Sequence, residues 1–362
     1  MKLIVVKIGS LGVSRAEGGV DHKKIQTLCA NLELLKDQGY RLILVSSGAI
    51  NAGRVQIPKP VDKDRTLSWQ QACAAAGMPI LMNAYTSALK NLKPAQVLVT
   101  HEDFKERQRF LNIRNTLFTL LESDHLPIIN ENDTVSTREI TVGDNDLLAA
   151  MVAEAIGAHM LVLLTEADGL FDRNPMDPEA IQLKKVGFDE KFESIKFSQK
   201  TSAGRGGMLT KLQAVRRLTP LGLDVVIATY NVPAPVSRAL EGAGSHFEGD
   251  KRFKIKNRLA WIASVAKPNC AIVVDEGARE ALMKGTNSLL PIGVKKVIGV
   301  FKRGDIVTVK CRQQIIAKGI VEFDSKESQK IAGLKSTQLA EVISDVPSLV
   351  VIHKDNLFLV RA

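Results

Sequence analysis

The chain has 362 residues, of which 45% are hydrophobic, and it carries a formal net charge of +10. This length predicts two domains, because single hydrophobic cores stop growing near ~250–300 residues. The longest apolar runs, 42–45 and 160–165, have the length of strands, far short of the ~18 residues of a membrane-spanning helix. We therefore expect no membrane segment. The N-terminal apolar run leads into Lys, Gly and Ser without a cleavage-like site, which indicates a first strand rather than a signal peptide.

The four cysteines are far apart and show no C-x-x-C spacing: Cys29, Cys73, Cys270 and Cys311. This spacing argues against a zinc site and against a disulfide framework. It is typical of a protein of the reducing cytoplasm, which is the location we expect. We assign no residue as a metal ligand.

Charge is unevenly distributed along the chain. Residues 1–250 contain 29 Lys and Arg against 29 Asp and Glu, whereas residues 251–362 contain 20 against 10. The whole positive excess therefore lies in the last third, which indicates two modules with different roles. A basic module allows a nucleic-acid-binding hypothesis for that part of the chain.

Apolar strand-like runs alternate with helix-like segments through the first 230 residues. The strands are expected at 3–8, 41–46, 95–99, 126–130, 160–165 and 224–228, and the helices at 21–38, 64–91, 108–123, 144–157 and 207–220. This alternation predicts an α/β domain with an open, mostly parallel sheet sandwiched by helices.

The C-terminal part has a different pattern. Residues 250–268 are basic and end in Pro268, and beyond them short strand-like runs mix with one or two helices. We expect a first domain over 1–258, a linker over 259–268, and a small β-rich domain over 269–362.

Polar, glycine-containing loops follow four of the expected strands. They read KIGS (7–10), SSGA (46–49), NENDT (130–134) and TEADG (165–169). In open parallel sheets, ligands bind at the carboxyl ends of the strands, so these loops mark the expected ligand edge.

Two lysines near glycines are candidates for binding phosphate. Lys7 ends the first strand and is followed by Gly9 and Ser10, and Lys211 lies in a helix preceded by a glycine-rich run, 204–207. Exposed amides at a helix N-terminus favour an anion. Lys211 is not followed by Ser or Thr, so the run is not a P-loop. For each loop, a glycine turn that merely caps a helix is the alternative interpretation.

Carboxylates and amides are concentrated between 129 and 146, where eight of eighteen residues are Asp, Glu or Asn. Asp144, Asn145 and Asp146 begin a helix, where one of them could serve as the N-cap. Three consecutive side chains point in different directions, so at least one should face the sheet edge near Asp133. Together with Ser47, this mixture suits a substrate that carries an ammonium and a carboxylate.

Six motifs in this order resemble the glutamate 5-kinases of the amino acid kinase family: VVKIGS, VSSGAI, INENDTV, VGDND, LLTEADGL and GRGGMLTKL. The C-terminal part resembles a PUA domain. The resemblance implies the amino acid kinase fold and an ATP- and Mg²⁺-dependent phosphorylation of the γ-carboxylate of L-glutamate, the first step of proline biosynthesis. A carboxylate is already ionised at neutral pH, so this reaction needs no general base. His101 and His125 are accordingly expected to be structural.

The resemblance also implies residue roles. Lys7 and Lys211 would neutralise the transferring phosphoryl group, with Asp146 orienting both lysines. The residues implied in glutamate binding are Ser47, Asp133, Asp144 and Asn145. The residues implied in ATP binding are Lys7, Gly9, Thr165, Glu166, Arg205, Gly206, Gly207, Met208, Leu209, Thr210 and Lys211. The family often has Asp in place of Glu166, Thr in place of Arg205 and Ser in place of Leu11, which affects details of nucleotide contact.

The same resemblance implies inhibition by proline, a γ-glutamyl phosphate reductase as a pathway partner, and a homo-oligomer. Two alternatives stay open at this stage. The C-terminal domain could bind RNA through a basic patch of Lys295, Lys296, Lys302 and Arg303. The kinase could also act on another carboxylate, such as aspartate or an N-acylated glutamate. The arginines of 106–114 are interpreted as a solvated or subunit-contacting helix face.

Overall fold

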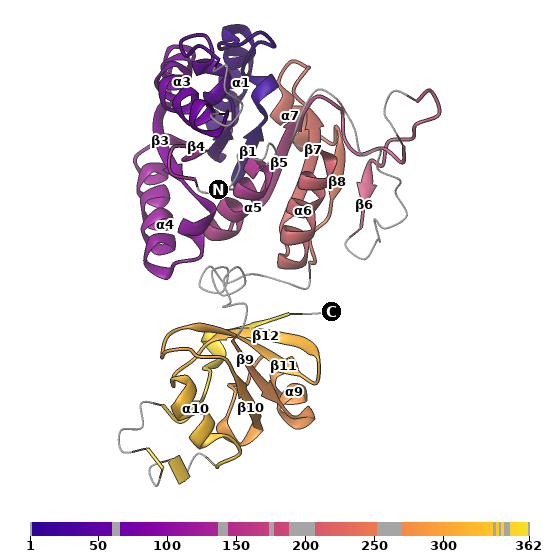
Figure 1. The fold of residues 1–362 in the computed structure, drawn as a ribbon. Coiled ribbons are helices and arrows are strands. Elements are labelled where there is room, and N and C mark those ends of the chain that lie inside the picture. The colour runs from indigo at the N-terminus through magenta and orange to yellow at the C-terminus, as the bar shows by residue number, and fades with distance from the viewer. Residues whose placement is uncertain are drawn as a thin grey trace. The chain divides into compact units, whose positions relative to one another are not determined.

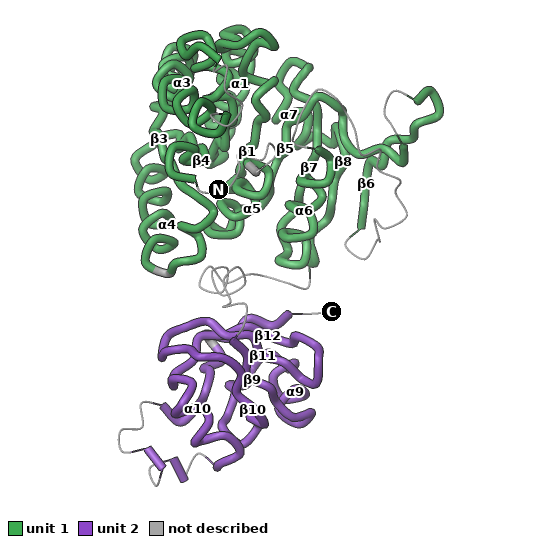
Figure 2. Tube along the Cα trace, in the orientation of Figure 1, with its two compact units in different colours: residues 1–254 green, residues 255–362 purple. Residues whose placement is uncertain are grey.

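The computed structural model describes residues 2–59, 66–136, 144–173, 177–187, 207–251, 270–335, 338–339, 342–343 and 348–360. The chain divides into two compact units, Met1–Lys254 and Ile255–Ala362 (Figure 2). The predicted linker over 259–268 and the boundary before it lie outside the described residues.

The first unit is built on an eight-stranded sheet (Figure 1). Its strands, in spatial order, are β3 (Lys93–Val99), β4 (His125–Glu131), β2 (Arg41–Ser46), β1 (Leu3–Ile8), β5 (Met160–Thr165), β7 (Asp224–Thr229), β8 (Ser245–Phe247) and β6 (Lys185–Val186). Neighbouring strands are parallel except for β7 and β8. The mostly parallel sheet is confirmed, and the short strands β8 and β6 at one edge are additional to those expected.

Helices cover both faces of this sheet. They are α1 (His22–Asp37), α2 (Ala49–Gly53), α3 (Thr66–Ala88), α4 (Arg107–Glu122), α5 (Asp144–Ile156), α6 (Met208–Leu218) and α7 (Pro235–Leu240), with short 3-10 turns η1 (Ser10–Gly12), η3 (His101–Phe104) and η5 (Thr219–Leu221). Side chains of α1, α3 and α7 share one core cluster, whereas α5 and α6 pack against each other. Within the described residues, no helix is long and apolar enough to cross a bilayer.

Strand alternation decides what each face of β1 contacts. Ile4, Val6 and Ile8 belong to the core cluster shared with α1 and α3. Because successive side chains of a strand point to opposite faces, Val5 and Lys7 point to the other face, where α5 packs against β1. The strand therefore carries Lys7 to the α5 side at its carboxyl end.

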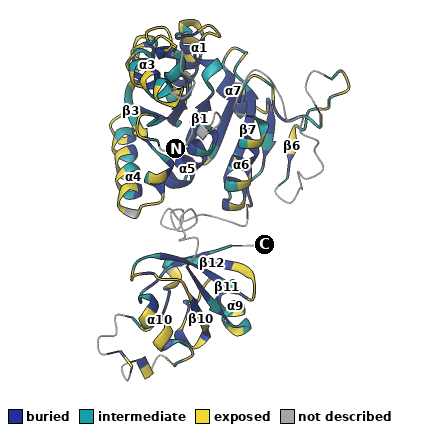
Figure 3. Ribbon diagram, in the orientation of Figure 1, coloured by how far each residue is buried: buried dark blue, intermediate teal, exposed yellow. Residues whose placement is uncertain are grey.

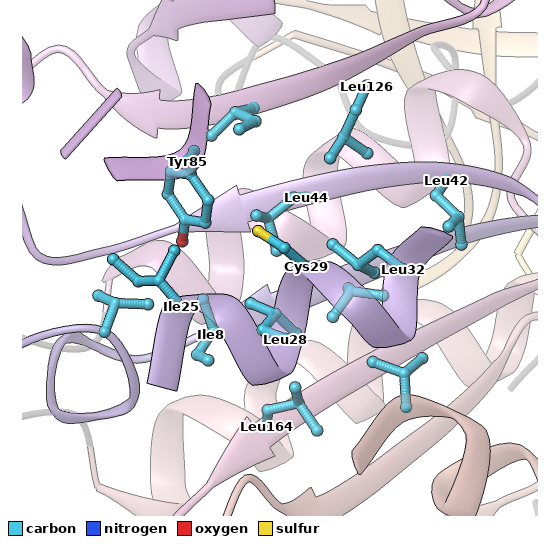
Figure 4. Close-up of a cluster of buried hydrophobic side chains, with 14 of the residues drawn as sticks. Ile8, Ile25, Leu28, Cys29, Leu32, Leu42, Leu44, Tyr85, Leu126 and Leu164 are labelled. Carbon is cyan, nitrogen blue, oxygen red and sulfur yellow. The ribbon is translucent and has the colours of Figure 1, made fainter. Parts of the chain in front are cut away.

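The core cluster excludes water from the α1 side of the sheet (Figures 3 and 4). Leu28 and Leu32 of α1 are buried against Leu44 of β2, and each such side chain contributes ~1.5–3 kcal/mol. The Tyr85 hydroxyl is satisfied by Ser46 Oγ at 2.7 Å. Burial raises the pKa of the Cys29 thiol to about 12, so Cys29 is a packing residue and not a nucleophile.

Two glycines let α2 and α3 pack with their backbones in contact. A Cβ at Gly77 would lie 1.9 Å from the Ala49 carbonyl oxygen, and a Cβ at Gly53 would lie 1.9 Å from the Cys73 carbonyl oxygen. Only glycine fits at these positions without moving a helix. This close packing fixes α2, and with it the loop from β2 that holds Ser47.

The second unit contains a five-stranded sheet, which agrees with the β-rich domain expected there. Its strands, in spatial order, are β10 (Val294–Ile298), β9 (Ala271–Val274), β11 (Ile306–Cys311), β12 (Gln314–Ile320) and β13 (Leu357–Leu359), accompanied by α9 (Glu276–Met283), α10 (Ser325–Ile331), η6 (Pro291–Gly293) and η8 (Lys354–Asn356). A separate core forms around Ile272, Val309 and Phe323.

Candidate active site

The sheet order favours a ligand site at the carboxyl ends of β1 and β5. These strands are neighbours, but the next strand along the chain after β1, which is β2, lies on one side, whereas the strands that follow β5, which are β6 and β7, lie on the other. Connections that diverge from adjacent parallel strands leave space for a ligand between them. The loops that carry Gly9, Ser47 and Glu166 all begin at this edge.

A buried carboxylate lies between two buried ammonium groups at this edge. Lys7 Nζ is 2.6 Å from Asp146 Oδ1, and Lys211 Nζ is 3.0 Å from Asp146 Oδ2. Lys7 comes from β1, Asp146 from the first turn of α5 and Lys211 from α6. All three side chains are at most 6% exposed. The structure therefore brings together the three residues expected to carry the chemistry.

Electrostatics keeps this carboxylate ionised. Burial opposes the charge of Asp146, but the ammonium groups of Lys7 and Lys211 outweigh it and lower the pKa of Asp146 to about 2. Burial lowers the pKa of Lys7, and the charge of Asp146 partly restores it. A carboxylate with so low a pKa is a poor proton acceptor at neutral pH, so Asp146 is suited to holding the lysines in place.

The N-terminus of α6 lies beside this cluster. Thr210 Oγ1 donates to Asp146 Oδ2 at 2.7 Å and lies 2.9 Å from the Gly207 carbonyl oxygen. The N-cap residue of α6 is Gly207, which makes no side-chain cap. Amides at such a helix start favour an anion. Thr210 thus ties a helix terminus suited to phosphate to the carboxylate between the lysines.

Ser47 and Asn145 also meet at this edge. Asn145 Nδ2 donates to Ser47 Oγ at 2.7 Å and to Asn130 Oδ1 at 3.0 Å. Asp133 is half-buried in the turn that follows β4. Asp144 begins α5, and its side chain lies outside what the structure describes. Ser47 and Asn145 are therefore in direct contact, and Asp133 follows a neighbouring strand.

The residues expected at the nucleotide are placed as follows. Thr165 ends β5 and is half-buried, and its carbonyl oxygen accepts a hydrogen bond from Tyr230 N at 3.0 Å. Glu166 is exposed, and its carbonyl oxygen accepts a hydrogen bond from Thr229 Oγ1 at 2.9 Å. Gly9 follows β1, and a Cβ there would lie 3.7 Å from Lys7 Nζ. At the start of α6, Met208 is half-buried and Leu209 is exposed. Arg205 and Gly206 lie outside the described residues.

Two features of the site were not expected from the sequence. Asn130 is 2% exposed and its Oδ1 accepts from Asn145, although it was not among the expected site residues. His101 Nδ1 lies 3.1 Å from Glu131 Oε2, a buried pair beside Asn130. A signal for Asn130 does exist. Side chains alternate along a strand, so Asn130 points to the same face of β4 as Leu126 and Ile128, which belong to the core cluster. It is therefore a polar residue in a core-facing position.

The described residues do not form a site that would hold a divalent cation by protein side chains alone. Among the described residues there is no group of three or more His, Cys, Asp and Glu side chains arranged to hold a metal ion. The two carboxylate oxygens of Asp146 each contact an ammonium group. Mg²⁺ in nucleotide sites is bound largely by phosphate oxygens and water, which fits this set of residues.

The basic residues of the C-terminal domain are at the surface. Lys295 and Lys296 lie on β10, and Lys302 and Arg303 lie in the turn before β11, all exposed. Arg303 Nη2 is 3.9 Å from Glu322 Oε2.

Comparison with known proteins adds to this geometry. The amino acid kinase family matches residues 2–229, and the PUA domain matches residues 271–343. Curated relatives described as glutamate 5-kinase include those of Citrifermentans bemidjiense (39% identical, covering 99% of this chain and 98% of the relative) and Dictyoglomus thermophilum (37%, 99% and 98%). A third, from Methylococcus capsulatus, is 39% identical and covers 98% of this chain and 96% of the relative.

Among solved structures, carbamate kinase from Giardia lamblia bound to AMP-PNP matches with a TM-score of 0.52 at 18% identity. The match covers 69% of this chain and 99% of that chain. This likeness concerns the fold alone.

Proposed function

The chain belongs to the glutamate 5-kinases of the amino acid kinase family, and on this premise we propose that it transfers the γ-phosphoryl group of ATP to the γ-carboxylate of L-glutamate. ATP with Mg²⁺ is the phosphoryl donor. The products are γ-glutamyl phosphate and ADP. The observation that carries the proposal is the carboxylate of Asp146 held between the ammonium groups of Lys7 and Lys211.

The reaction balances without a proton transfer. A γ-carboxylate oxygen of glutamate forms a bond to the γ-phosphorus, and the bond from that phosphorus to the bridging oxygen breaks, so that its electron pair leaves with ADP. The nucleophile is ionised at neutral pH because the pKa of a Glu side chain is ~4.3. The barrier therefore comes mainly from the approach of two anions, and positioned cations lower it.

Lys7 and Lys211 supply that positive charge. Lys7 comes from the carboxyl end of β1 and Lys211 from the first turns of α6, so they reach this edge of the sheet from two elements. Asp146 holds both ammonium groups in place before the substrate arrives, which removes the need to reorganise them during the reaction. Asp146 is thus a positioning residue in this proposal.

The nucleotide binds along the start of α6 and the loops after β1 and β5. The backbone amides at the very start of α6 receive phosphate oxygens, with Gly9 leaving room beside Lys7. Thr165, Glu166 and the segment from Arg205 to Lys211 complete the nucleotide site. Mg²⁺ neutralises phosphate charge when it is bound with ATP.

The amino-acid head of glutamate binds at the loops after β2 and β4 and the start of α5. Ser47 and Asn145 offer hydroxyl and amide groups, and Asp133 and Asp144 offer carboxylates to the ammonium. A free ammonium gains from these carboxylates, whereas an acylated nitrogen does not. This favours L-glutamate over an N-acylated acceptor.

We also propose the wider setting of the reaction. The product is a reactive acyl phosphate, so a γ-glutamyl phosphate reductase in the same compartment would consume it. Proline would act as a feedback inhibitor, and the enzyme would work as a homo-oligomer in the cytoplasm. The free, buried thiols of the described cysteines are compatible with a reducing compartment.

The test is ADP release from ATP and Mg²⁺ with L-glutamate, L-aspartate or N-acetyl-L-glutamate, with hydroxylamine present to trap an acyl phosphate. We expect hydroxamate from L-glutamate only, with less of it when proline is added. Hydroxamate formed from another acceptor would show that L-glutamate is not the only substrate. ADP release without hydroxamate would refute carboxyl phosphorylation.

A further inference from the structure

A buried serine closes the turn that follows β1. Ser14 is 1% exposed, and its Oγ lies 2.5 Å from the carbonyl oxygen of Ser10. A carbonyl oxygen can only accept, so the hydroxyl hydrogen of Ser14 is used in this bond. The backbone N–H of Ser14 donates to the same oxygen at 2.9 Å. Ser14 therefore holds Ser10, the first residue of η1, by two hydrogen bonds.

Asn51 of α2 holds this serine from the other side. Asn51 Nδ2 lies 3.1 Å from Ser14 Oγ. Because Ser14 gives its only hydroxyl hydrogen to Ser10, the Asn51 atom at this contact must be the donating nitrogen. The carbonyl oxygen of Asn51 also accepts from the backbone N–H of Gly19 at 2.8 Å, in the hairpin that the bridge between Ser14 and Val20 closes. One residue of α2 thus holds the segment after η1 at two points.

The segment from residue 8 to residue 14 is therefore attached to α2 and its preceding loop at both ends. At its start, the backbone N–H of Ser47 donates to the carbonyl oxygen of Ile8 at 3.1 Å, and at its end Asn51 donates to Ser14. Between these points lies Gly9, where a Cβ would be 3.7 Å from Lys7 Nζ. The turn held by Asn51 borders the ammonium group of Lys7.

The two attached elements differ in how firmly they are fixed. α2 packs with its backbone against that of α3 at Gly53 and Gly77, so it keeps its place when the side chain of Asn51 is removed. η1 is a turn of three residues, and the hydrogen bonds of Ser10 and Ser14 hold it toward α2. Loss of the bond between Asn51 and Ser14 should therefore displace the turn and leave α2 in place.

We propose that Asn51 is a positioning residue that sets how tightly the enzyme holds its nucleotide. Through Ser14 it keeps η1 at a fixed distance from Lys7, so that the phosphates meet a rigid wall. The amino-acid side of the site, which begins at Ser47 ahead of α2, does not depend on this bond. This inference rests on the proposed function, because it concerns the nucleotide of that same reaction.

A set of alanine variants isolates the bond between Asn51 and Ser14. The experiment measures the Kd for MgADP by calorimetry, and the KM for ATP and for L-glutamate by hydroxamate formation, in the full chain and in its variants. Asn51→Ala removes the donor, Ser14→Ala removes the hydroxyl, and the double variant removes both. Asn31→Ala is the matched control, because Asn31 is a buried asparagine that joins α1 to α7, with Oδ1 accepting from Val236 N at 2.8 Å.

For Asn51→Ala we expect the Kd for MgADP and the KM for ATP to rise about 3- to 10-fold, as for the loss of one hydrogen bond, with the KM for L-glutamate changed less than about twofold. Ser14→Ala should have at least as large an effect, because Ser10 also loses a donor. Adding Asn51→Ala to Ser14→Ala should change the Kd by less than about twofold, since Asn51 then has no bond to Ser14 left to lose. Asn31→Ala should lower the Tm and leave all three constants within about twofold of the wild type.

Effects of Asn51→Ala and Ser14→Ala that simply multiply in the double variant would show that the two residues act separately, and they would overturn the inference. So would an unchanged Kd in Asn51→Ala, an equal rise in the KM for both substrates, or a rise of the same size in Asn31→Ala. MgADP binding does not depend on the acceptor. A wild-type protein that shows these changes in Kd but forms no hydroxamate from L-glutamate would therefore overturn only the proposed function.

Discussion

Replacing Asp146 by Asn tests the link between the buried ion cluster and both stability and turnover. The change keeps the size and shape of the side chain but removes the charge that lies 2.6 Å from Lys7 Nζ and 3.0 Å from Lys211 Nζ. Two buried ammonium groups then lose the carboxylate that they share. We expect a folded but weakened protein whose lysines are no longer held in alignment.

The size of the stability loss follows from the pKa of Asp146. A pKa lowered from 3.8 to about 2 means that the surroundings favour the ionised form over the neutral form. That difference corresponds to ~2–3 kcal/mol, because one pKa unit is worth ~1.4 kcal/mol. A neutral Asn resembles the protonated acid, so Asp146→Asn should lower the free energy of unfolding at pH 7 by ~2–3 kcal/mol. Turnover should fall by about 10²- to 10³-fold, as when a preorganised electrostatic contact is lost.

The assay is chemical denaturation of both proteins between pH 7 and pH 3, together with kcat for L-glutamate. Because the pKa of Asp146 is lower in the folded state, its stabilising contribution is complete above the ordinary value of 3.8 and declines as the pH falls toward about 2. The difference in the free energy of unfolding between wild type and variant should therefore become smaller at acid pH. Equal stability at pH 7, or a gap that widens with acid, would refute the reasoning.

Glu154→Gln is the matched control for this prediction. Glu154 is a second buried carboxylate of α5, and its Oε2 lies 2.7 Å from Arg217 Nε. Losing this pair should also destabilise the protein, because a buried ion loses its partner. Its kcat should stay near that of the wild type, since the pair lies away from the lysines. A loss of turnover as large as that of Asp146→Asn would mean that destabilisation alone explains both.

Four further changes test other parts of the account. Lys211→Met keeps the length of the side chain but removes its charge, so kcat should fall by about 10²- to 10³-fold in a protein with an unchanged circular dichroism spectrum; activity within tenfold of wild type would contradict the assigned role. Ser47→Ala should raise the KM for L-glutamate about tenfold and leave the KM for ATP unchanged, and equal effects on both would argue against amino-acid binding there. Gly77→Ala should lower the free energy of unfolding, measured with a denaturant, by at least ~1–3 kcal/mol, because its Cβ would lie 1.9 Å from the Ala49 carbonyl oxygen. An unchanged free energy of unfolding would mean that α2 and α3 can separate freely. A metal chelator should stop turnover, and Mg²⁺ should restore it, without changing the Tm of the nucleotide-free protein; a lower Tm would indicate a resident ion.

The strands and helices of the first unit could be predicted because their signals are local. A parallel sheet buried on both faces gives continuous apolar runs, and β1, β2 and β5 have the bounds expected from those runs. Lys7 could be assigned for the same reason, since it ends such a run. The strands β8 and β6 were not predicted, because three- and two-residue strands have no periodic signal of their own.

The pairing of side chains in the site depends on the order of the strands. Asp146 and Lys211 are 65 residues apart in sequence and meet because α5 and α6 pack side by side. The sequence indicated that one of three consecutive polar residues would face the sheet edge, but it did not indicate which atom each would meet. Asn130 was missed because its hydrogen bond to Asn145 joins β4 to the start of α5, and a contact of that kind has no signature in composition or spacing.

The most direct test of the central claim follows the oxygen atom that attacks phosphorus. L-glutamate labelled with ¹⁸O in its γ-carboxylate is incubated with the full chain, ATP, Mg²⁺ and hydroxylamine, and the released inorganic phosphate is analysed by mass spectrometry. Hydroxylamine attacks the acyl carbon, so the phosphate leaves with the oxygen that bridged it to glutamate. If the carboxylate attacks the γ-phosphorus, each phosphate released with hydroxamate carries one ¹⁸O atom. Unlabelled phosphate would show that water attacked instead, and it would contradict the assignment of this site to carboxyl phosphorylation.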